Sequence, residues 1–311
     1  MNNIPSLQEY YEPPEEIIQA GLDGKLVLFV GAGVSMLAPI NYPSWATLAN
    51  KILEDLRKEQ FINYSEFEQL KILDSKKQLS IAHFIAENKK FPIDYKKYFE
   101  GKSETNSIYE HINAIGCPCI TTNYDELLAP RVNKNNDGST TDLFINRISE
   151  PEKFLLSDLD KRNTVIHLHG AISNPRTMII TTKNYLKHYE HDNVKTLLAE
   201  LFSIKVVLFI GYGLEEMEIL EQILRKGSAT EIKERKRFAL QGFFTNEKYL
   251  YENLWQYYKN TFGIHLLGFN RDIKNFDCLK DIIEQWSSII TINKPSLFDD
   301  IQFMNEVLGD E

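Results

Sequence analysis

The chain has 311 residues and a mass of 36.1 kDa, enough for a domain with a full hydrophobic core. Its composition, 43% hydrophobic and 25% charged residues, is typical of globular proteins and excludes a disordered or collagen-like chain. The net charge of −9 argues against direct binding of nucleic acid, because basic residues that neutralise phosphates supply most of the non-specific affinity.

The number of cysteines and the hydropathy of the chain indicate in which cellular compartment the protein is expected. The three cysteines cannot form the paired framework of a small secreted protein, and no apolar signal stretch precedes the acidic segment 10–16. The longest apolar run, Leu26 to Ile40, is shorter than the roughly 18 residues that a membrane-spanning helix needs. We therefore expect a cytoplasmic protein without a membrane span.

Short apolar runs rich in β-branched and aromatic residues alternate with helical patterns along the chain. This alternation predicts an α/β fold with a Rossmann-like, mostly parallel sheet. The runs expected to form strands are Leu26–Val30, Cys119–Thr122, Val165–Leu168, Met178–Thr181, Val206–Ile210, Phe238–Phe243 and Ile264–Phe269.

Helical spacing dominates two further stretches. Leu48, Ile52 and Leu56 recur at i, i+4 and i+8, and no convincing strand interrupts the region around them. We expect a helical insertion at about residues 46–112, joined by a second helical stretch at about 184–203, within one domain over residues 20–290. Residues 291–311 are expected to form a tail with a C-terminal helix capped by Ser296.

Four of the expected strands end in glycine or polar residues. In open parallel sheets, ligands bind in the crevice beyond the carboxyl ends of the strands, so these segments are expected to face one pocket. They are Gly31-Ala32-Gly33-Val34-Ser35, Thr121-Thr122-Asn123-Tyr124-Asp125, His167-Leu168-His169-Gly170 and Gly211-Tyr212-Gly213.

The glycine turn after the first strand is suited to a nucleotide. Gly31 and Gly33 lack Cβ atoms, so the backbone can turn sharply and bring amide groups against a phosphate. Tight strand-to-helix turns also use glycine for purely structural reasons, so this alternative stays open. The third position of a dehydrogenase fingerprint is Met36, which disfavours hydride transfer.

The polar residues after the other strands are candidates for catalysis. Asn123 and Asp125 can point into the pocket, although capping is the commoner role of such residues in turns. His169, at the end of its strand, can act as a general base, whereas His167 lies two residues deeper and is interpreted as a packed residue. Cys117 and Cys119 do not form a Cys-x-x-Cys pair, so we expect no metal.

Taken in order, these four motifs resemble the sirtuin superfamily over about residues 20–290. The resemblance implies an NAD-binding Rossmann domain, with the glycine turn on the pyrophosphate and Asn123 and His169 as the catalytic pair. The chain lacks the four-cysteine zinc ribbon of sirtuin deacylases, so no zinc is expected. Ser44-Trp45 and the Thr-Thr-Asn-Tyr-Asp string are more similar to the bacterial sirtuin-like, NAD-consuming proteins of antiphage defence.

In that branch, the expected function is cleavage of NAD, as substrate, to nicotinamide and ADP-ribose. Gly31, Ala32, Gly33 and Ser35 are expected to hold the pyrophosphate, and Asp125 the carboxamide or the loop itself. Gly211 and Tyr212 are expected to border the phosphate and ribose. The alternatives are an NAD-dependent protein deacylase or ADP-ribosyltransferase, and a nucleotide-binding regulatory subunit.

A constitutive NAD hydrolase is toxic to its host, so we expect control from outside the domain. The resemblance implies a homo-oligomer, or a partner such as a HerA-type ATPase or a phage-sensing protein.

Overall fold

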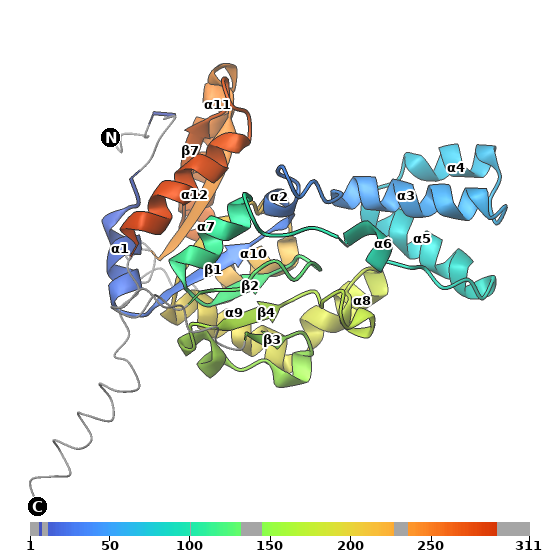
Figure 1. The fold of residues 1–311 in the computed structure, drawn as a ribbon, viewed down its shortest axis with the longest axis horizontal. Coiled ribbons are helices and arrows are strands. Elements are labelled where there is room, and N and C mark those ends of the chain that lie inside the picture. The colour runs from blue at the N-terminus through green and yellow to red at the C-terminus, as the bar shows by residue number, and fades with distance from the viewer. Residues whose placement is uncertain (1–5, 8–11, 100, 132–144, 227–235, 291–311) are drawn as a thin grey trace, which may run out of the picture.

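A computed structural model describes residues 6–7, 12–99, 101–131, 145–226 and 236–290 (Figure 1). The expected tail helix at 291–311 lies outside these residues. Within the described part of the chain, seven strands form a single sheet in the order β3-β4-β2-β1-β5-β6-β7. The strands are β1 Leu26–Val30, β2 Cys119–Thr121, β3 Asn146–Ile148, β4 Thr164–His167, β5 Val206–Ile210, β6 Arg237–Phe243 and β7 Ile264–Asn270.

All the strand pairs of this sheet are parallel, which confirms the predicted α/β fold class. Parallel strands need crossover connections, and helices supply them on both faces. The helices are α1 Glu15–Leu22, α2 Ala32–Ser35, α3 Trp45–Lys58, α4 Tyr64–Lys71, α5 Ser75–Asn88, α6 Lys96–Phe99, α7 Ile108–Ile115, α8 Thr182–Glu190, α9 Asp192–Ile204, α10 Met217–Lys226, α11 Lys248–Phe262 and α12 Asp277–Ile289.

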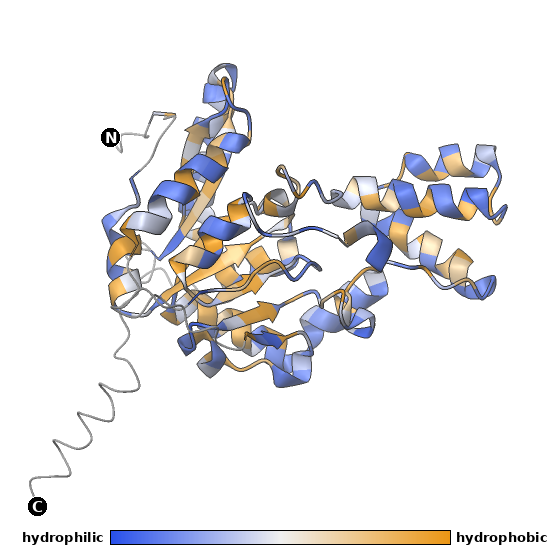
Figure 2. Ribbon diagram, viewed as in Figure 1, coloured by the Kyte–Doolittle hydropathy of each residue, from blue (hydrophilic) through white to orange (hydrophobic). Residues whose placement is uncertain are grey.

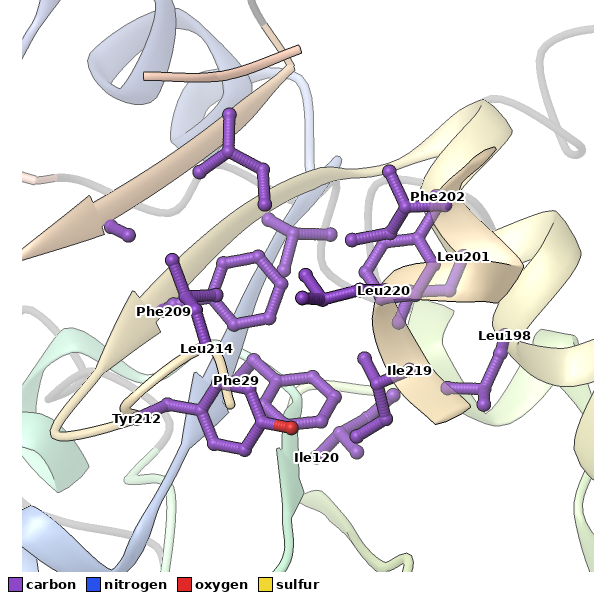
Figure 3. Close-up of a cluster of buried hydrophobic side chains, with 14 of the residues drawn as sticks. Phe29, Ile120, Leu198, Leu201, Phe202, Phe209, Tyr212, Leu214, Ile219 and Leu220 are labelled. Atoms are coloured by element: carbon purple, nitrogen blue, oxygen red, sulfur yellow. The ribbon is translucent and has the colours of Figure 1, made fainter. Parts of the chain in front are cut away.

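Both faces of the sheet are buried, because successive side chains of a strand point to opposite sides. In β1, Leu26, Leu28 and Val30 belong to the core shared with α1, α7 and α12. Val27 and Phe29 belong to the core on the other face, where α9, α10 and α11 pack (Figure 3). The sheet is accordingly the most hydrophobic layer of the molecule, and the helices turn their polar residues outward (Figure 2).

Helices α3 to α6 form a separate helical cluster, which projects from the carboxyl side of the sheet (Figure 1). Its core includes Leu48, Ile52 and Leu56, the residues whose spacing predicted a helix. Ser44 begins α3 by accepting a hydrogen bond from the Thr47 amide at 3.1 Å. The described residues between β1 and β2 contain no strand.

Two parts of the expected helical insertion, α7 and α9, pack beside the sheet and not in the helical cluster. Helix α7, which includes residues 108–112, lies against α12 beside the sheet, and α9 lies against α10. Helix α8 contacts both α5 and α9, so it links the helical cluster to the sheet. The exact limits of the inserted subdomain stay a prediction.

The expected strand at Met178–Thr181 was wrong. The segment makes no ladder; Ile179 donates a single backbone hydrogen bond to the His169 carbonyl, at 2.9 Å. Met178 and Ile180 are buried in the core of the helical cluster, and Thr181 caps α8. Its apolar residues therefore reflect burial between the sheet and the cluster, not pairing in the sheet.

Candidate functional site

The four sequence-predicted segments lie at the carboxyl ends of β1, β2, β4 and β5. These strands are adjacent in the sheet, in the order β4-β2-β1-β5. β2 pairs with β4 in a register that opposes Thr121 to His167. Asn123 and His169 each lie two residues beyond this pair, so they come from neighbouring strand ends.

The turns after β1 and β5 are packed backbone against backbone. The Gly31 amide donates to the Ile210 carbonyl at 2.9 Å, and the Gly33 amide donates to the Gly211 carbonyl at 2.8 Å. A Cβ atom on Gly31 would lie 2.6 Å from the Gly211 carbonyl oxygen. The glycines are thus required for this close approach. Their amides are already bonded within the protein, and a role on a pyrophosphate stays a prediction.

Asn123 is the centre of a buried hydrogen-bond network. Its Nδ2 atom lies 3.1 Å from the Gly31 carbonyl oxygen, 2.9 Å from Ser35 Oγ and 3.2 Å from the Tyr109 hydroxyl. Ser35 and Tyr109 in turn donate to Asp125 Oδ2 at 2.8 and 3.1 Å. The network fixes the orientation of the Asn123 amide.

Asp125 and Tyr109 support this network from the protein interior. Burial raises the pKa of Asp125, while its hydrogen bonds oppose that rise. Burial also raises the pKa of Tyr109 well above its usual value, so the hydroxyl stays a donor. Asp125 therefore braces Asn123 and Ser35. Tyr109 was missed by sequence reasoning, because nothing near it in the chain marks a site.

The Asn123 side chain keeps one atom available for a ligand. Its Oδ1 is buried and has no hydrogen-bond partner among the described residues. Leaving such an acceptor unpaired costs free energy, which a ligand hydroxyl can recover. Asn123 lines a pocket of about 30 Å³. The other lining residues are Ala32, Ser35, Pro43, Trp45, Leu48, Phe99, Thr122, Tyr124 and Asp125.

His169 is fully buried in a second polar cluster. Its Nε2 atom lies 2.7 Å from the Tyr189 hydroxyl and 3.6 Å from Glu216 Oε2. Its Nδ1 atom makes a longer contact, 3.5 Å, with the Tyr185 hydroxyl. Burial, with smaller effects from His188 and Lys76, lowers the pKa of His169 well below its usual value. The imidazole is therefore neutral at pH 7, as a general base must be.

Three residues of the second cluster were missed in the sequence. Tyr185 and Tyr189 are four residues apart in α8, and this spacing places both on the face toward His169. Glu216 follows the Gly211-Tyr212-Gly213 motif. Aromatic residues at helical spacing usually belong to a core, so the sequence offered no signal that separates these from packing residues.

Tyr212 lies differently from the expectation that it borders a ligand. Its ring packs against Phe29 and Phe209, with centroid separations of 5.0 and 5.6 Å (Figure 3). The side chain is thus part of the core below the site. Its contact with a nucleotide stays a prediction.

The helical cluster reaches both polar networks. The Trp45 ring lies 5.8 Å from that of Tyr124 and 6.3 Å from that of Tyr185. Lys76 of α5 contacts Glu218 at 3.1 Å, and its ammonium lies 4.1 Å from the centre of the Tyr185 ring. The cluster therefore covers the carboxyl edge of the sheet where the two networks lie.

His167 is buried, as expected for a packed residue. Its Nδ1 atom lies 3.2 Å from the Asn123 carbonyl oxygen. Burial lowers the pKa of His167 to about 4. The residue thus supports the backbone of the Asn123 loop in its neutral form.

His188 predicts that stability depends on pH. Burial lowers its pKa to about 4. A histidine with a lowered folded-state pKa stabilises the protein above its unfolded pKa of about 6.5, and this contribution is lost as the pH falls. We expect the free energy of unfolding to lose about 2 kcal/mol through His188 between pH 7 and pH 5. Urea denaturation of wild type and His188→Gln at both pH values measures it.

Glu216 and His167 titrate in both proteins. The difference between the losses of unfolding free energy in wild type and in His188→Gln therefore isolates the contribution of His188. The loss on acidification is expected to be about 2 kcal/mol smaller in His188→Gln. An equal loss in the two proteins would contradict the assignment.

The described residues contain neither a candidate metal site nor a candidate membrane span. They contain no group of three or more His, Cys, Asp or Glu side chains that could hold a metal ion. In the same part of the chain, no helix has both the length and the apolar character needed to cross a membrane.

Comparison with known proteins supports the resemblance seen in the motifs. Residues 119–262 match the SIR2-like domain family. The chain is 28% identical over 211 residues to defense-associated sirtuin 2 of Bacillus subtilis, an alignment that covers 66% of this chain and 19% of the relative. The chain thus spans about a fifth of the length of the curated relative that it matches. The resemblance found in the sequence motifs is confirmed, because the chain contains a region that matches the SIR2-like domain and is similar to a defense-associated sirtuin.

Proposed function

We propose that the chain hydrolyses the bond between nicotinamide and ribose in NAD, and that this activity serves antiphage defence. The SIR2-like domain and the defence-associated relative support the use of NAD and the biological role. The observation that carries the chemistry is the pairing of two features at adjacent strand ends. A fixed amide with a free acceptor, Asn123 Oδ1, follows β2, and the neutral, buried His169 follows the neighbouring strand β4.

The chemistry of NAD suits such a site. Nicotinamide is cationic in NAD and leaves as a neutral molecule with the electron pair of the broken bond, so it needs no acid. The ribose passes through an oxocarbenium-like state, as in glycosidases. A water oxygen then bonds to the ribose carbon and loses a proton. In this proposal, Asn123 orients a ribose hydroxyl or the water, and His169 accepts the proton.

Incubation of the purified chain with NAD, followed by chromatography, tests this proposal. Nicotinamide and free ADP-ribose are expected from the wild type, and much less from Asn123→Ala, because the ribose or water is no longer oriented. Thr105→Ala, outside both networks, is the control. ADP-ribose attached to protein would favour a transferase instead. Wild type that binds NAD and releases no nicotinamide, even when concentrated, would contradict hydrolysis by the chain without a partner.

We further propose that self-assembly or a partner chain controls the activity. The relative carries the matched region within a much longer protein, so the domain works there beside other parts of the chain. Light scattering on the same preparation tests self-assembly. A fully active monomer of 36.1 kDa would contradict it.

A further inference from the structure

We propose that Glu216 is a positioning residue for His169, which orients the imidazole and stabilises its protonated form. The inference rests on the proposed function and adds a residue that the motifs did not indicate. Glu216 Oε2 lies 3.6 Å from His169 Nε2, and the Tyr189 hydroxyl bridges the pair, donating to Glu216 at 3.4 Å. This carboxylate contacts the base, not the pocket around Asn123.

The loop that carries Glu216 is held in an unusual conformation. Gly211 has φ +61°, and Leu214 has φ +56°, which is rare for a leucine. The Leu214 side chain is buried in the core with Phe29 and Ile219 (Figure 3). Such a conformation persists only where the surroundings determine it. Burial of Leu214 thus anchors the loop and turns Glu216 toward His169 at the start of α10.

The contacts of the imidazole assign the two nitrogens different roles. Nε2 is held at 2.7 Å by the Tyr189 hydroxyl, on the side of Glu216. Nδ1 makes only the 3.5 Å contact with Tyr185, which a substrate hydroxyl or water can replace. The proton from water is accepted at Nδ1, and the imidazolium formed is stabilised by the Glu216 carboxylate before the proton returns to solvent. A carboxylate behind a catalytic histidine acts in this way in hydrolytic triads.

Charged and titratable groups from several elements surround the pair. They are Tyr185, His188 and Tyr189 of α8, Lys76 of α5, Tyr212 after β5 and Glu218 of α10. Burial raises the pKa of Glu216 to about 7, although Lys76 and the tyrosine hydroxyls oppose the rise. Glu216 is therefore half ionised near neutral pH, and only its ionised form stabilises the imidazolium.

Glu216→Gln keeps the shape of the side chain and removes its charge. We expect the kcat for nicotinamide release by the wild type to rise with pH through about 7, the pKa of Glu216. At pH 8, kcat of Glu216→Gln is expected to be about 10²-fold lower with KM unchanged, and below pH 6 the two proteins should converge. A merely structural role would lower the rate by the same factor at every pH. Glu215→Gln, an exposed neighbour, is the matched control.

A titration without NAD separates this inference from the proposed function. In protein with labelled histidine, the NMR signal of His169 is assigned by its loss in His169→Gln. We expect this signal to shift with an inflection near pH 7 in wild type and Glu215→Gln, and not in Glu216→Gln. The same curve in all three proteins would overturn the role of Glu216. Absence of nicotinamide release from the wild type would overturn only the hydrolase.

Discussion

His169→Ala is expected to lower kcat for nicotinamide release by about 10²- to 10⁴-fold, the usual cost of losing a positioned general base. The side chain is fully buried, and its neutral form follows from that burial. Neither neighbouring histidine takes its place, because His167 contacts the Asn123 backbone and His188 lies against the Tyr189 ring. Initial rates of nicotinamide release at saturating NAD measure the effect.

Two comparisons keep this test specific. His169→Gln retains a polar group at the position and should lose nearly as much activity, because glutamine cannot accept the proton. His111→Ala should retain full activity, because His111 lies beside Glu284 of α12 and contacts neither network. Circular dichroism and the thermal midpoint report whether each variant is folded. Full activity in folded His169→Ala would show that another group is the base.

Gly211→Ala is expected to destabilise the protein by about 3 kcal/mol or more, because overpacking and a left-handed backbone both oppose the new methyl group. Gly211 has φ +61°, and a Cβ atom there would lie 2.5 Å from the Val34 amide nitrogen. The obstruction is backbone, which cannot move aside as a side chain can. Urea denaturation monitored by circular dichroism measures the loss.

Gly213→Ala is the matched control, two residues along the same loop. A Cβ atom at Gly213 would have its nearest neighbour at 3.6 Å, in the flexible side chain of Glu215. The expected change is within about 1 kcal/mol. Similar losses in the two variants would show that the packing of the two glycine turns does not limit stability.

The sheet could be predicted because strands that are buried on both faces form continuous apolar runs in the sequence. β1 and β5 are continuous apolar runs, and both are strands with the expected limits. Two local errors have different causes. Met178–Thr181 is as apolar as a strand, although it packs between layers, and β3, with only three residues and two of them polar, is too short to show a pattern.

The site could be predicted only in part. Residues that directly follow strands were identified, because topology alone brings strand ends together. Their partners could not be, since they come from helices distant in the chain: Tyr109 contacts Ser35 across 74 positions. Glu216 could not be predicted either. An acidic residue after a glycine turn shows no pattern that marks it as part of a site, and only the fold places it beside Tyr189. Gly31 is required for the close packing of the two glycine turns, and its role in phosphate binding stays a prediction.

The small pocket beside Asn123 has a consequence for measured affinity. Its volume of about 30 Å³ is far below the roughly 300–1,000 Å³ of sites that enclose a ligand. Under the proposed function, a dinucleotide therefore requires a second conformation, in which the helical cluster lies farther from the sheet. If about 1% of molecules adopt it, the apparent Kd is about 100-fold weaker than the intrinsic one. Anything that favours the separated arrangement thus raises the affinity for NAD without touching a residue that binds it.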